Sequence, residues 1–215
     1  MEFTLALLDE ATGNLLVNDE LGLERLDIGA AESVGCARPR SISQGIKALR
    51  SSSMTARING FWHDDLMVGP GRRSVVRFQG CPIRCVGCWV PETHDENAGY
   101  DEPIDRLADT LLSSEHDGVT ILGGEPFAQP AALARLLVEL RSREPNVSIV
   151  VYSGYTLEAL KVRLESQGYS FVLELIGVLV DGPYVRSRAH SLDCGCDDET
   201  QRWTGSCNQS VRHLQ

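Results

Sequence analysis

Short apolar runs alternate with longer amphipathic stretches over most of the chain. Four runs are rich in β-branched residues and end at Gly, Pro, Asn or Asp, a pattern typical of buried strands. They cover residues 71–78, 118–122, 147–152 and 175–180. Leucine recurs at helical spacing in three stretches between them: one opens at Pro103, one opens at Pro130, and one runs from Thr156 as N-cap to Gly168 as C-terminal stop. The alternation predicts an α/β fold around a parallel sheet.

Each predicted strand is followed by residues that are unusual for a plain loop. These segments are the cysteine loop after residue 78, then GGEP (123–126), SGY (153–155) and DGPY (181–184). Because ligands collect at the carboxyl edge of a parallel sheet, the four segments predict one binding site. Paired glycines let a backbone approach a ligand, Glu125 can accept from an ammonium group, and Ser153 and Asp181 can bind hydroxyls or amines. Taken singly, these are also ordinary turn residues.

Composition narrows the classes of protein. The 215 residues are 42% hydrophobic and 23% charged, which suits one domain with a buried core and an appendage. No apolar run approaches the ~18 to 20 residues of a membrane span, and no secretory signal is visible, so we expect a cytoplasmic protein without a membrane partner. A net charge of −10 argues against binding nucleic acid. Seven cysteines without an export signal indicate metal or redox chemistry.

The cysteine loop has the spacing C-x3-C-x2-C, formed by Cys81, Cys85 and Cys88, with no fourth cysteine nearby. A structural zinc site takes four ligands and usually pairs C-x2-C with a second distant pair, although His94 could complete a Cys3His site. A [4Fe-4S] cluster fits the spacing better, since three irons are then held by thiolates and one is left for another ligand. A chelating amino acid is such a ligand.

The ordered motifs, from the cysteine loop through GGEP, SGY and DGPY, resemble the radical S-adenosylmethionine (SAM) superfamily. Within it, VGPGRRSVVRFQGCPIRCVGCWVPETH resembles the activating enzymes of glycyl radical enzymes, most closely the small anaerobic ribonucleotide reductase activases. The tail RWTGSCNQSV (202–211) also resembles their closing segment. The resemblance covers about residues 54–215 and implies a partial, open βα barrel. About 160 residues are too few for a closed barrel of ~250.

The resemblance implies a role for each matching residue. Cys81, Cys85 and Cys88 would ligate a [4Fe-4S] cluster whose open iron is chelated by SAM. Gly87 and Trp89 would lie against adenine. The GGEP strip would receive the methionyl amine, and the polar ends of the next two strands would add contacts. These cofactor contacts are Gly123, Gly124, Glu125, Pro126, Ser153 and Asp181.

The implied activity is reductive cleavage of SAM to a 5′-deoxyadenosyl radical, which takes hydrogen from a glycine of a partner, here anaerobic ribonucleotide reductase. A flavodoxin- or ferredoxin-type protein would supply the electron. The chain departs from the activases at Val68, where they carry an acidic residue, and at Cys207 and Ser210 in the tail. The alternatives are therefore a radical SAM enzyme acting on another peptide or a small metabolite, or a non-catalytic electron-transfer or sensing protein. The GGEP strip argues against the last.

Arginines and aromatic residues precede or surround the cysteine loop, where they could face an anionic ligand or dock a peptide of the partner. They are Arg72, Arg73, Arg77, Arg84, Phe61, Trp62 and Trp89. Core packing and solvated charge are the alternative interpretation.

Four cysteines lie outside the loop and could bind a second metal, or remain free thiols, which we favour. They are Cys36, Cys194, Cys196 and Cys207. Residues 1–53 carry no motif, and residues 37–53 are Ser-rich and without period, as in a linker. Residues 3–8 and 21–28 are apolar enough for a hairpin or a short helix. We expect a working domain of residues 54–215 that begins near Met54.

Overall fold

The computed structural model describes residues 6–8, 15–19, 22–24, 53–190 and 202–214. The chain divides into two units, Met1–Ser52 and Ser53–Gln215. In the first unit, β1 (Ala6–Leu8), β2 (Leu15–Asp19) and β3 (Gly22–Glu24) form a small antiparallel sheet. Its two outer strands fall in the stretches expected to form a hairpin or short helix, and each pairs with β2.

The second unit is built on a seven-stranded sheet with the order β10-β9-β8-β7-β5-β4-β6. The strands are β4 (Thr55–Asp65), β5 (Arg73–Phe78), β6 (Tyr100–Pro103), β7 (Gly118–Gly123), β8 (Ile149–Ser153), β9 (Val178–Asp181) and β10 (Ser210–His213). The four predicted strands are β5, β7, β8 and β9, and they pair in parallel. The predicted α/β class with a parallel sheet is thus confirmed. The antiparallel strands β4, β6 and β10 were not predicted.

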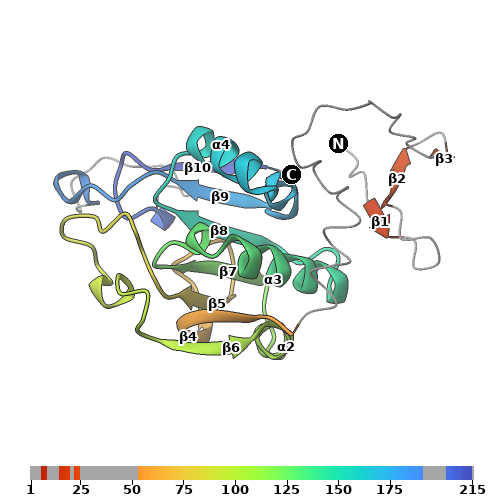
Figure 1. The fold of residues 1–215 in the computed structure, drawn as a ribbon, viewed down its shortest axis with the longest axis horizontal. Coiled ribbons are helices and arrows are strands. Elements are labelled where there is room, and N and C mark those ends of the chain that lie inside the picture. Colours follow the sequence, from red (N-terminus) through yellow and green to blue (C-terminus); the bar gives the residue numbers. More distant parts are fainter. Residues whose placement is uncertain (1–5, 9–14, 20–21, 25–52, 191–201, 215) are drawn as a thin grey trace, which may run out of the picture. The chain divides into compact units, whose positions relative to one another are not determined.

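Three α-helices lie along one face of this sheet (Figure 1). They are α2 (Ile104–Leu112), α3 (Pro130–Arg143) and α4 (Leu157–Gln167). All three occupy the predicted stretches, and α4 has the predicted caps: the Thr156 hydroxyl accepts from the Ala159 amide, and Gly168 is left-handed. The leucines of α2 and α3 that face the protein interior are fully buried, as are Val76 and Ile121 of the sheet, and α2 contacts α3, β4 and β5. None of the helices in the described parts of the chain is long and apolar enough to cross a membrane.

The opposite face of the sheet carries a second apolar cluster and a buried cation. Val150, Val178 and Val180 form the cluster. Arg73, at the start of β5, is fully buried and donates to the carbonyls of Val119 and Ser148 at 2.7 and 2.8 Å. Burial lowers its pKa to about 10. Because the cysteine loop follows the other end of β5, the expectation that Arg73 lies beside this loop is wrong.

Candidate functional site

The loops that follow the four parallel strands meet at one edge of the sheet, at the left of Figure 1. The Gly124 amide donates to the Phe78 carbonyl at 2.9 Å, which joins the end of β7 to the end of β5. The Gly182 amide donates to the Tyr155 carbonyl at 3.0 Å, which joins the loops after β9 and β8. The cysteine loop, GGEP, SGY and DGPY therefore lie together, as the topology of a parallel sheet dictates.

The three cysteines of the loop are free, partly exposed thiols. The Cys88 amide donates to the Cys85 carbonyl at 3.1 Å, so the second half of the motif is a tight turn. Burial raises the pKa of the Cys81 thiol. Among the residues that the structure describes, no three Cys, His, Asp or Glu side chains lie close enough to share a single metal ion.

The base of the cysteine loop is closed by a side chain that was not among the predicted site residues. Gln79 is almost fully buried, and its amide group donates to the carbonyls of Glu92 and Asp95 at 2.9 and 2.7 Å. Its position between a predicted strand and the first glycine of the loop was the only available signal. The Cys81 amide donates to the carbonyl of His94, whose Nε2 is buried without a hydrogen-bond partner in the described chain.

The two glycines of the GGEP strip are required by close backbone packing. A Cβ at Gly123, where φ is +128°, would lie 2.4 Å from the Phe78 nitrogen. A Cβ at Gly124 would lie 2.3 Å from the Gly80 carbonyl oxygen. The strip is therefore pressed against the start of the cysteine loop, which fixes one relative to the other.

Glu125 links the ends of β7 and β8. Its side chain is fully buried and accepts from the amides of Phe127 and Gly154, at 3.1 and 2.8 Å, and from the Ser153 hydroxyl at 3.0 Å. No salt bridge involves this carboxylate within the described residues. Burial raises its pKa to about 7, while the hydrogen bonds and the charge of Arg163 act in the opposite direction.

The raised pKa of Glu125 predicts that the metal-free protein loses stability as the pH rises. The folded state binds a proton up to about pH 7, whereas the unfolded carboxyl releases it near 4.5. The stabilisation is therefore complete below about pH 4.5 and is lost as the pH rises through 7, at a cost of about 3 kcal/mol. Urea unfolding between pH 5 and 8 measures it. Glu125→Gln should flatten this slope, and an unchanged slope in that variant would contradict the assignment.

The remaining polar residues of the strand ends have internal partners. Pro126 is buried and opens the 3-10 helix Pro126–Ala128, and the Ser153 hydroxyl also accepts from the Tyr155 amide at 3.0 Å. Asp181 has different partners from Glu125. Its carboxylate accepts from the Leu157 amide at 2.8 Å and from Arg212 Nε at 2.7 Å. It fixes the start of α4, where the helix dipole favours a negative charge.

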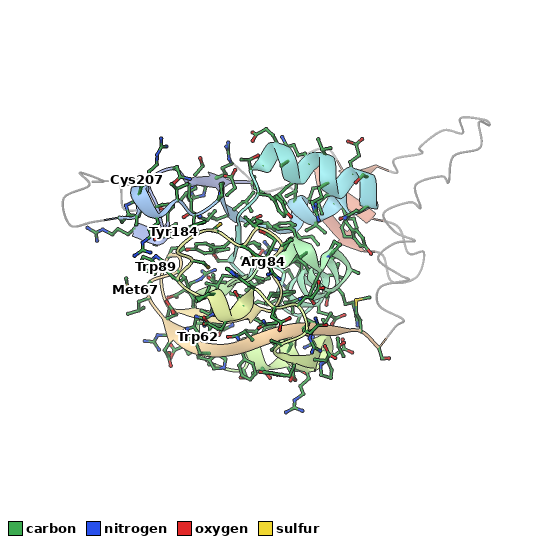
Figure 2. The ribbon with its side chains drawn as sticks, turned by 60° about the vertical axis from the view of Figure 1, so that its left-hand side comes forward. Trp62, Met67, Arg84, Trp89, Tyr184 and Cys207 are labelled. Atoms are coloured by element: carbon green, nitrogen blue, oxygen red, sulfur yellow. The ribbon has the colours of Figure 1, made fainter. Side chains whose placement is uncertain are left out.

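Two residues flanking the third cysteine meet the loop after β9. Trp89 is 71% exposed, and its indole N–H donates to the Tyr184 hydroxyl at 2.7 Å. Figure 2 shows the two side chains next to each other. Gly87 has a φ of +75°, and a Cβ there would lie 2.6 Å from Cδ of Arg186. Tyr184 belongs to the predicted DGPY segment, but it was not among the predicted site residues.

The charged and aromatic residues expected around the loop are divided between two ends of the sheet. Arg77 lies over the Trp62 ring at 4.9 Å and pairs with Glu92 at 3.6 Å, near the site, and Arg84 is exposed on the loop itself (Figure 2). Arg72 pairs with Asp64 and Glu115 at the other end of β5. Phe61 is 38% exposed and contacts the His63 ring edge to face.

Of the four other cysteines, the structure describes only Cys207. Its exposed sulfur lies 3.6 Å from His190 Nδ1. Cys36, Cys194 and Cys196 lie outside the described residues, so the expectation of free thiols there stays a prediction.

Comparisons with known proteins match one family model and several relatives to this chain. The family described as a 4Fe-4S single cluster domain matches residues 67–212. The anaerobic ribonucleoside-triphosphate reductase-activating protein of Escherichia coli K12 is 31% identical over 159 residues, which are 70% of this chain and 94% of that protein. The pyruvate formate-lyase-activating enzyme of Clostridium pasteurianum is 37% identical over 87 residues, 38% of this chain and 37% of that one. The structure of QueE from Escherichia coli gives a TM-score of 0.43 at 19% identity, covering 54% of this chain and 58% of that chain.

Proposed function

Because the chain belongs to the 4Fe-4S single cluster domain family and to the anaerobic ribonucleoside-triphosphate reductase-activating proteins, we propose that it is a radical SAM oxidoreductase that activates a glycyl radical enzyme. The observation that carries this proposal is the cysteine loop packed directly on the GGEP strip, within a chain of that family. A cluster-binding loop and an amine-binding strip are both needed to hold a chelated amino acid, and an electron carrier needs only the first.

Three thiols on one short loop suit an iron-sulfur cluster, and we assign Cys81, Cys85 and Cys88 as its ligands. When bound, the reduced [4Fe-4S] cluster supplies the electron that cleaves SAM to methionine and a 5′-deoxyadenosyl radical, which removes a hydrogen atom from the substrate. The protein's own residues position the reactants and exclude water. Gln79 contributes by holding the base of the loop closed.

We assign the SAM contacts to the residues that meet at the sheet edge. Gly87 and Trp89 would lie against adenine. The strip from Gly123 to Pro126 would receive the methionyl amine, with Ser153 holding the Glu125 carboxylate in place. A buried carboxylate that makes no salt bridge within the described chain is a suitable neighbour for an ammonium group. For Asp181 we propose an indirect role, because both of its oxygens already bind internal donors.

The proposed partner is a glycyl radical enzyme, with anaerobic ribonucleotide reductase first, since 31% identity over 94% of a relative's length joins this chain to activating proteins of that name. A flavodoxin- or ferredoxin-type protein is the proposed electron donor. The proposed active unit is residues 54–215, because every assigned contact lies there. Its four parallel strands are proposed to form an open βα barrel, whose unclosed side would admit a partner's glycine loop.

We expect a glycyl radical on the partner. The reduced, cluster-loaded protein is mixed with SAM and an anaerobic ribonucleotide reductase without oxygen, and the mixture is examined by electron paramagnetic resonance for the glycyl doublet. A reductase whose target glycine is replaced by alanine is the matched control. If 5′-deoxyadenosine forms but no glycyl radical enzyme from the same cell gives a doublet, the substrate is another peptide or a metabolite, as the loss of an acid at Val68 would suggest. If no 5′-deoxyadenosine forms, the protein is a carrier or a sensor.

A further inference from the structure

The tail motif GSCNQ, residues 205–209, makes none of the cofactor contacts assigned above. Instead it binds the turn that follows β9. The Gln209 side chain accepts from the amides of Gly205 and Ser206, at 2.8 and 3.1 Å, and donates to the Gly182 carbonyl at 2.9 Å. The Asn208 side chain donates to the Pro183 carbonyl at 2.8 Å. Two amide side chains thus tie the tail to the DGP turn.

The residue that follows this turn is Tyr184. A Cβ at Gly205 would lie 3.2 Å from the Tyr184 ring, so the glycine lets the tail pack closely on the ring. The Val185 amide donates to the Ser206 hydroxyl at 3.2 Å, just beyond Tyr184. The ring is therefore supported from behind by residues 205–209, which we call the tail brace.

Tyr184 in turn holds Trp89. The two rings meet edge to face, with centroids 6.1 Å apart and planes at 75°, in addition to the 2.7 Å hydrogen bond. Trp89 follows the third cysteine directly, and with 71% of its surface exposed it has little packing of its own. An exposed side chain loses rotamer freedom only where a specific contact fixes it. Tyr184 provides that contact.

We infer that Tyr184 is a positioning residue of the cofactor site: the tail brace holds Tyr184, and Tyr184 orients Trp89 beside the third cluster cysteine to receive the adenine of SAM. The inference rests on the proposed function, since it presumes that Trp89 meets the cofactor. It gives the tail motif a task at the site, although the motif lies more than a hundred residues beyond the cysteine loop in the chain.

Tyr184→Phe removes the hydroxyl and keeps the ring. Loss of one neutral hydrogen bond should weaken SAM binding roughly 2- to 13-fold. Iron content should not change, because no cysteine is altered. Binding is measured by equilibrium dialysis of SAM against the cluster-loaded protein. The rate of 5′-deoxyadenosine formation at saturating SAM should fall less than the affinity. Tyr100→Phe, on the edge strand β6, is the matched control and should leave both unchanged.

Fluorine NMR distinguishes a specific effect of Tyr184 on Trp89 from a general effect on the stability of the fold. The chain has three tryptophans, so 5-fluorotryptophan labelling gives three fluorine resonances, which are assigned by single Trp→Phe replacements. In Tyr184→Phe the Trp89 resonance should shift, while those of Trp62 and Trp203 stay in place. In the unaltered protein, SAM should move the same resonance.

A double-mutant cycle decides the coupling. If Tyr184 acts through Trp89, then Trp89→Phe combined with Tyr184→Phe should weaken SAM binding no more than Trp89→Phe alone. Additive losses, or a Tyr184→Phe affinity equal to that of the unaltered protein, would overturn the inference while leaving the proposed function intact. Failure of the unaltered, cluster-loaded protein to bind SAM at all would instead refute the proposed function.

Discussion

Anaerobically reconstituted protein with Cys85→Ala is expected to lose the broad brown absorption of a [4Fe-4S] cluster and to form no 5′-deoxyadenosine above background. Cys85 is the middle cysteine of the motif and a proposed cluster ligand, and its carbonyl also accepts from the Cys88 amide in the turn that carries the third thiol. Each thiolate holds one iron, so removal of one leaves a second iron without a protein ligand. Iron and sulfide per chain, visible absorption and product formation measure the loss.

Cys207→Ala is the matched control for iron content, because it removes an exposed thiol outside the loop. It should bind as much iron as the unaltered protein. About four irons and no zinc per chain would also leave no room for a second metal site. Stoichiometric zinc in place of iron, or a full cluster in Cys85→Ala, would contradict the assignment of the loop.

The central strands could be predicted because each is a short, continuously buried run rich in β-branched residues, and the three helices because leucine recurs in them at helical spacing. Strands β4, β6 and β10 could not. β4 mixes polar residues with a shift of register around Gly60, and β6, with the sequence YDEP, is mostly exposed. These strands lie at or near the edges of the sheet, where only part of a strand is covered, so the hydrophobic signal is weak.

Local sequence also misplaced some charges and missed some contacts. Arg73 follows Arg72 in the chain, yet it is buried. Burial is tolerated because its guanidinium group donates hydrogen bonds to backbone carbonyls and to a side-chain hydroxyl. Gln79 and Tyr184 act through partners that only the fold brings near; Tyr184 meets Trp89 across 95 positions. Residues that act through such long-range contacts therefore carry no motif and are found only from the fold.

The two glycines of GGEP have a different role in the structure from the one that the sequence suggests. From the sequence, a glycine pair suggested a backbone open to a ligand. In the structure the space beside Gly124 is filled by protein: the Gly80 and Thr93 carbonyl oxygens lie 2.3 and 3.0 Å from where a Cβ would be. The pair is therefore needed to seat the strip against the cysteine loop, and the geometry of the whole site depends on that contact.

Gly124→Ala is accordingly expected to damage stability and cofactor binding together. The added methyl group meets backbone oxygen atoms, which cannot rotate away as a flexible side chain would, so the strip must move off the loop. Overpacking of this kind costs on the order of 3 kcal/mol. We expect a lower midpoint of urea unfolding at an unchanged slope, and, in protein that still folds, SAM affinity reduced by more than about tenfold, the equivalent of 1.4 kcal/mol.

Gly60→Ala is the matched control, because a Cβ at Gly60 would have no atom within 4 Å. It makes the same chemical change in a strand of the same sheet, and its unfolding free energy should stay within about 0.5 kcal/mol of the unaltered protein. If the two variants unfold alike and bind SAM alike, the contact between strip and loop does not determine the site. If Gly124→Ala alone is impaired, the glycine pair acts by seating the GGEP strip against the cysteine loop, so that the proposed amine-binding and cluster-binding segments stay together at one edge of the sheet.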